Sequence, residues 1–105
     1  MGKSNFNRAI KLAGELVEVG VVLSVSRASR KQDKKGIDFF CLMPGRGEDQ
    51  VVKVPVQVKS SAKSAQRFRE MHSDEILTIV VNDYRSDDDI KANLSRNLVR
   101  FIVDH

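Results

Sequence analysis

The chain has a single cysteine and no long apolar segment, and each of these absences excludes a class of protein. Cys41 stands alone among 105 residues, so no internal disulfide can form. No other ligand residue lies at metal-binding spacing from Cys41, which argues against a zinc site. We expect Cys41 to be a small buried hydrophobic residue on a strand. No segment reaches membrane-spanning length and the N-terminus lacks an apolar signal region, so we expect a cytoplasmic protein without membrane contact.

The remaining composition is that of an ordinary folded domain. Hydrophobic residues make up 41% of the chain and charged residues 30%, with no repeat and no low-complexity tract. These proportions argue against extensive disorder. The length allows one modest hydrophobic core, so we expect one domain over residues 1–105.

Positive charge is concentrated in the first part of the chain. Residues 1–63 contain twelve Lys or Arg and six Asp or Glu, whereas residues 64–105 contain six and eight. A loop is expected at 27–35, and Asp33 is its only acid. Such a loop would attract a polyanion, although its charges can equally serve only to keep the protein soluble. Its cations are Arg27, Arg30, Lys31, Lys34 and Lys35.

The spacing of apolar residues predicts alternating helices and strands. Apolar residues within 6–19 recur at helical spacing. Three consecutive aspartates from Asp87 onward suit the first turn of a later helix. Short runs of β-branched residues predict strands. The expected fold class is therefore α/β, with a mixed central sheet flanked by helices. The predicted helices are 6–19, 63–72 and 87–97, and the predicted strands are 21–26, 37–43, 51–59, 76–81 and 98–103.

Strand 51–59 alternates well, which places its polar residues on one face. Gln57 and Lys59 therefore share a face, opposite four valines. Asp38 opens the neighbouring strand. Its carboxylate, the Gln57 amide oxygen and the Val58 carbonyl are ligands of the kind that Mg²⁺ or Mn²⁺ takes. Lys59 can stabilise developing negative charge or help to position water, so the pattern predicts metal-dependent phosphodiester hydrolysis.

The arrangement resembles the PD-(D/E)XK nuclease superfamily, whose restriction-endonuclease-like core has the order αβββαβ. Gly36-Ile37-Asp38 is similar to the turn into the second strand of that family. Gln57-Val58-Lys59-Ser60-Ser61 is similar to its third-strand triplet, in the Q-x-K form that some homing endonucleases carry. Archaeal Holliday junction resolvases are similar as well. The resemblance spans about residues 6–81 and implies a magnesium-dependent endonuclease that acts on DNA, including structure-selective cleavage.

Two departures from the family pattern concern the metal site. Gln57 replaces the usual Asp or Glu, so one carboxylate is missing. Many members carry a Glu on the first helix, and Glu15 and Glu18 are the candidates, of which Glu18 lies nearer the sheet on a helical wheel. The resemblance thus assigns catalysis to Asp38, Gln57, Lys59 and Glu18, metal binding to Asp38, Gln57 and Val58, and DNA binding to the five cations of 27–35 with Ser60 and Lys63.

Other functions remain open at this stage. A chain this small has little surface for reading a DNA sequence, so a homodimer or recognition of a branched DNA structure is considered. The site can also have decayed into a DNA-binding module without catalysis. A third hypothesis is an interaction protein in which Asp38 and Lys59 form an ordinary ion pair.

Overall fold

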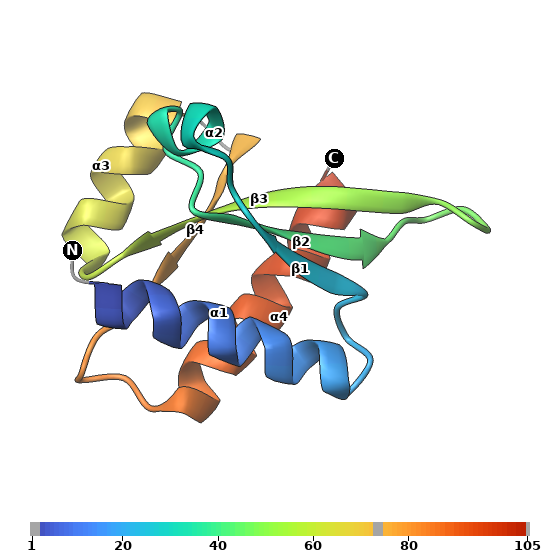
Figure 1. Ribbon diagram of the computed structural model, residues 1–105, viewed down its shortest axis with the longest axis horizontal. Helices are drawn as coiled ribbons and strands as arrows, with labels where there is room; N and C mark the ends of the chain where they lie inside the picture. Colours follow the sequence, from blue (N-terminus) through green and yellow to red (C-terminus); the bar gives the residue numbers. More distant parts are fainter. Residues whose placement is uncertain (1–2, 73–74, 105) are drawn as a thin grey trace.

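The computed structural model describes residues 3–72 and 75–104 (Figure 1). It is an α/β structure with a four-stranded mixed sheet flanked by helices, which confirms the predicted class. The elements are α1 (Lys3–Glu18), β1 (Ser24–Arg27), α2 (Arg30–Lys34), β2 (Phe39–Pro44), β3 (Val51–Lys59), α3 (Ala62–His72), β4 (Leu77–Val80) and α4 (Asp87–Asp104).

The sheet has the strand order β1-β2-β3-β4. The first three strands pair antiparallel, and β4 pairs parallel to β3 after the crossover through α3. Pro55 is tolerated in the long strand β3 because its neighbour β4 begins pairing only at Val56. The missing N–H of Pro55 therefore costs no hydrogen bond to β4.

The main core lies between the sheet and two helices. Figure 1 shows α1 and α4 on one side of the sheet, with α3 and the short α2 toward the other side. Alternate residues of β2 and β3 face the core, as their register shows by pairing Phe39 with Val56 and Cys41 with Val54. Burial raises the pKa of the Cys41 thiol to about 12, so this cysteine is a core residue as expected and not a nucleophile.

The predicted last strand is wrong, because α4 continues through it to Asp104. Ile90, Leu94 and Leu98 are fully buried, whereas Ala92 and Arg96 between them are exposed; in a strand all five would share a face, so the pattern fits a helix. The β-branched residues Val99 and Val103 misled the prediction, and both are exposed. Packing of the continuous apolar stripe outweighed their weak strand preference.

The predicted basic loop is also wrong in part, because five of its residues form α2. The Ser29 hydroxyl accepts a hydrogen bond from the Gln32 backbone, and the Gln32 side chain accepts one from the Ser29 N–H. This reciprocal pair of hydrogen bonds is a capping box, which the Ser-x-x-Gln spacing indicates. The cations around residue 30 are therefore displayed on a short helix.

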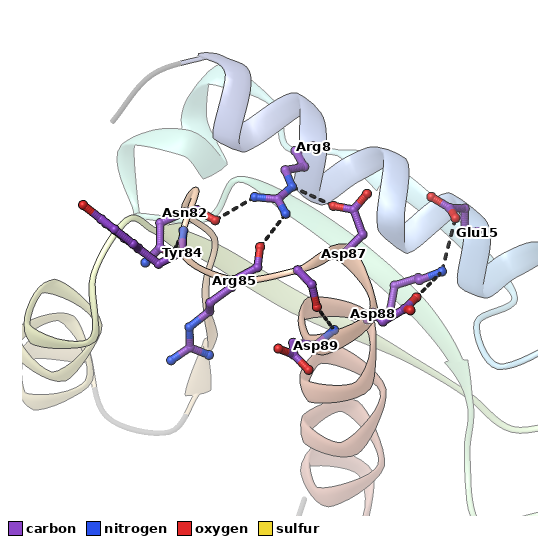
Figure 2. Close-up of polar contacts among 10 residues, drawn as sticks. Arg8, Glu15, Asn82, Tyr84, Arg85, Asp87, Asp88 and Asp89 are labelled. Carbon is purple, nitrogen blue, oxygen red and sulfur yellow. Dashed lines mark hydrogen bonds and ion pairs between the residues drawn. The ribbon is translucent and has the colours of Figure 1, made fainter.

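One arginine of α1 holds the loop that leads into α4 (Figure 2). Arg8 Nε donates to Asp87 at 2.8 Å, and its two terminal nitrogens donate to the carbonyls of Asn82 and Arg85 at 2.7 and 2.6 Å. Ser86 caps α4 by accepting a bond from the Asp89 N–H. The aspartates therefore begin a helix, as predicted, and Asp87 also joins α4 to α1.

In the described part of the chain, no helix has the length and apolar character that crossing a membrane requires.

Because Leu98 lies on the core face of α4 and Val99 on its outer face, alanine substitutions there should have unequal effects. Leu98→Ala should lower the free energy of unfolding by about 2–5 kcal/mol. Val99→Ala, the matched control, should change it by less than about 0.5 kcal/mol. Urea denaturation measures both, and equal losses would contradict a helix in this register.

Candidate active site

Asp38 is tied at three points where β1, β2 and β3 meet. Its backbone N–H donates to the Val56 carbonyl at 2.8 Å, and its carbonyl accepts from the Ala28 N–H at 3.2 Å. Its carboxylate Oδ2 accepts from the Val58 N–H at 2.8 Å. The side chain thus replaces a backbone acceptor at the end of the sheet. The other oxygen, Oδ1, accepts no hydrogen bond from the described residues.

The surroundings of Asp38 disfavour its charge. Burial raises the pKa of the carboxyl above its usual value of 3.8, and the hydrogen bond from Val58 opposes this effect. The charge of Asp33 raises the pKa further, whereas Lys59 lowers it. A cation bound beside Asp38 would relieve the cost of its ionised form.

Gln57, which precedes the residue bound by this carboxylate, has an unsatisfied side-chain oxygen. The side chain is buried, and its Nε2 donates to the carbonyl of Val58 at 3.1 Å. Its Oε1 is buried with no hydrogen-bond partner among the described residues. Buried amide oxygens normally have a partner, so this one has unused capacity for a ligand. The Val58 carbonyl retains a second lone pair.

Gly36 closes over this oxygen because it has no side chain. A Cβ at Gly36 would lie 2.7 Å from the Phe68 ring of α3 and 3.7 Å from Gln57 Oε1. Its φ of +89° is also strained for other residues. Glycine is therefore required where the chain passes from α2 to Asp38.

Lys59 lies on the same side of β3 as Gln57. Its ammonium is 5.0 Å from the centre of the Phe68 ring, a cation–π contact that positions the half-buried side chain. Its charge also acts on Asp38. The structure thus brings together Asp38, Gln57, Val58 and Lys59.

Glu18, assigned to catalysis from the sequence, is not brought to this site. It is exposed at the C-terminal end of α1, which leads to the start of β1. The start of β1 pairs with Leu42, far along β2 from Asp38, so Glu18 lies at the opposite end of the sheet. Glu15 is paired with Lys91 at 3.3 Å, and the first turn of α1 has no acid.

The DNA-binding candidates surround the site unevenly. Arg30, Lys31, Lys34 and Lys35 are exposed on or beside α2, directly before Gly36. Arg27 ends β1 and lies over the ring of Phe6 at 5.4 Å. At the start of α3, Lys63 is exposed, and Ser61 rather than Ser60 caps the helix by accepting from the Ser64 N–H at 3.1 Å.

The sequence did not reveal that the loop after β4 reaches this end of the sheet. Asn82 Nδ2 donates to the Ser60 carbonyl at 3.0 Å, and Asn82 Oδ1 accepts from the Tyr84 N–H at 3.0 Å. The tyrosine side chain is 98% exposed although its loop is held firmly. The one available signal in the sequence was Tyr84, an aromatic residue within a polar loop. No sequence pattern indicates that Asn82 contacts Ser60.

Searches for similar proteins returned nothing for this chain: no family model, no curated protein and no solved structure matches. No group of three His, Cys, Asp or Glu side chains able to hold a metal ion occurs in residues 3–72 and 75–104. The donors at the site are one carboxylate, one amide oxygen and one carbonyl, a set of hard oxygens that suits Mg²⁺ or Mn²⁺ better than zinc.

Replacing Asp38 by asparagine and by alanine should separate its charge from its hydrogen bond. Because the pKa is raised in the fold, the ionised carboxylate costs stability at neutral pH, and this cost disappears as the pH falls below 3.8. Asp38→Asn should therefore be at least as stable as the wild type at pH 7, with the difference shrinking in acid. Asp38→Ala leaves the Val58 N–H unpaired and should lose about 1–3 kcal/mol.

Chemical denaturation of both variants between pH 3.5 and pH 7, spanning the range from about the ordinary carboxyl pKa upward, measures these effects. Equal destabilisation by asparagine and alanine at pH 7 would contradict this account of Asp38.

Proposed function

We propose that the protein is a metal-dependent endonuclease of the PD-(D/E)XK type that hydrolyses phosphodiester bonds in DNA. The observation that carries the proposal is the junction of Asp38 and Gln57 through Val58. Val58 donates its N–H to the carboxylate and accepts a bond from the Gln57 amide. Both side chains therefore bond to the same residue, and each keeps an oxygen, Asp38 Oδ1 and Gln57 Oε1, without a hydrogen-bond partner among the described residues.

The order of elements supports the same proposal. Omitting the short α2, the chain reads helix, three strands, helix, strand, as in the αβββαβ core of that superfamily. Asp38 precedes the second strand, and Gln57-Val58-Lys59 ends the third. The restriction-endonuclease-like fold is thus part of the proposal and rests on this order together with the position of the motif.

Asp38, Gln57 and Val58 are the residues that would hold the metal. A bound Mg²⁺ would neutralise charge on the phosphate and lower the pKa of a bound water. Asp38 supplies the one full negative charge, and a bound cation would offset the cost that burial imposes on its ionised form. Lys59 would stabilise the charge that develops on the phosphate, because its ammonium lies against the Phe68 ring and its charge acts on Asp38.

The surroundings of the site suit a DNA backbone. The exposed cations of α2, with Lys63 and the Ser60 region at the start of α3, would contact phosphates without reading sequence. Tyr84 offers an exposed ring on which an unpaired base can stack. Such contacts favour branched or partly single-stranded DNA, and a homodimer would place two sites on one substrate.

A second candidate function is DNA binding without cleavage. The observation that favours it is the single carboxylate at the site, since Glu18 lies at the far end of the sheet and Gln57 carries no charge. Fewer anionic ligands weaken the binding of a divalent cation.

Asp38→Asn and Lys59→Met should abolish cleavage of supercoiled or branched DNA in Mg²⁺ or Mn²⁺, lowering the rate by at least about 100-fold. Lys53→Met is the matched control, because Lys53 lies on the same strand and also contacts a ring, that of Phe40 at 4.3 Å. Its rate should stay near that of the wild type.

Gel electrophoresis of the products measures cleavage, and a gel shift measures binding. A salt-sensitive shift without cleavage would leave the second candidate, and the absence of both would refute the two. Equal losses in Lys59→Met and Lys53→Met would contradict the role of Lys59.

A further inference from the structure

A groove follows the open side of β4 between α3 and α4. β4 is an edge strand of the sheet (Figure 1). Two adjoining hollows of about 640 and 290 Å³ lie along it and share the residues Arg69, Thr78 and Asn97. Because β3 and β4 are parallel, the smaller hollow, which includes Val80, opens at the end of the sheet where β3 ends at Lys59.

The groove has an excess of unpaired positive charge. Three arginines line the groove: Arg69 from α3, Arg85 from the loop before α4, and Arg100 from α4. Asp104 is the one acid among the lining residues. None of the three guanidinium groups has an ion pair or hydrogen bond with another described residue. Figure 2 shows the Arg85 side chain directed away from Arg8 and Asp87. An anionic ligand would supply the missing partners.

The floor of the groove contains a polar group without a partner. Thr78 is 5% exposed, and its Oγ1 has no hydrogen-bond partner among the described residues. Buried hydroxyls are normally satisfied, so this one points to a ligand or a bound water. Asn97 reaches the same hollows from α4 and also has no partner in the described chain.

The residues of α4 that face the groove are not explained by helix stability. Asn93, Asn97 and Arg100 lie on one side of the helix at spacings of four and three, beside the buried stripe of Ile90 and Leu94. Asparagine is a weak helix former in the middle of a helix. Asn93 accepts a hydrogen bond from Arg96 within α4 at 3.4 Å, so Asn97 is the asparagine here that indicates a polar contact made outside the helix.

We infer that this groove holds a single-stranded segment of nucleic acid, with successive phosphates on Arg69, Arg85 and Arg100. Added peptide strands fit less well, because Leu77, Thr78 and Ile79 are buried and leave little of the β4 edge accessible. A chain of evenly spaced phosphates matches arginines spread along the groove. The choice of nucleic acid rests on the proposed function, whereas the anionic character of the ligand rests on the groove alone.

The test compares wild type with a groove variant, Arg69→Gln with Arg85→Gln and Arg100→Gln, by fluorescence anisotropy. The probes are a labelled oligothymidylate and a labelled duplex of equal length, in EDTA so that cleavage does not interfere. Lys11→Gln with Lys53→Gln and Arg67→Gln is the control, since it removes the same charge from exposed residues that line neither hollow.

The groove variant should bind the single strand at least about tenfold more weakly than the control variant, and its salt slope should fall by about 2, as expected for three lost phosphate contacts. Duplex affinity should be equal in the two variants. Equal single-strand affinity in the two variants, or an equal loss on single strand and duplex, would overturn the inference.

A second variant tests the floor of the groove. Thr78→Val removes the unpaired hydroxyl and should not lower the thermal midpoint, yet it should weaken single-strand binding several-fold; wild-type affinity would overturn the contact assigned to Thr78. If the wild type never cleaves DNA but the groove variants show this binding pattern, the nuclease is refuted and the groove stands.

Discussion

The bond between the Asp38 carboxylate and the Val58 N–H is the constraint on which the rest of the site depends. In place of a backbone acceptor, a side chain continues the pairing of β2 with β3 at 2.8 Å. The same residue is tied through its backbone to Val56 and Ala28, so the start of β2 is joined here to β3 and to the residue that follows β1. A carboxylate used in this way is fixed in position, partly desolvated and left with one oxygen free to bind a cation.

The two faces of β3 separate the main core from the proposed site. Its valines 54, 56 and 58 are buried against α1 and α4 and belong to the main core. Gln57 and Lys59 project from the other face toward α3, where Phe68 contacts Lys59 and would collide with any side chain at position 36. A substitution on the face of the proposed site therefore leaves the main core filled, although Gln57 is itself buried.

The sequence predicted those parts of the fold that depend on the spacing of apolar and polar residues within one segment. The alternation in Val51–Lys59 gave the bounds of β3 correctly, and it put Gln57 and Lys59 on one face. Leu98–Val103 was assigned wrongly because its β-branched residues resemble a strand, whereas the stripe from Ile90 to Leu98 continues the helix. Glu18 was misplaced for a different reason, since a helical wheel gives the face of a residue but not which end of the sheet it reaches. Contacts such as Asn82 with Ser60 depend on tertiary structure and leave no local signal.

The central claim is that Asp38, Gln57 and Val58 form one divalent-cation site. Crystals of the wild type and of Asp38→Asn soaked in Mn²⁺, with data collected for anomalous scattering, test it most directly. The account predicts one anomalous peak in the wild type, contacted by Asp38 Oδ1, Gln57 Oε1 and the Val58 carbonyl oxygen, and no peak in the variant. No peak in the wild type at saturating Mn²⁺, with Lys59 bridged to Asp38, would contradict it.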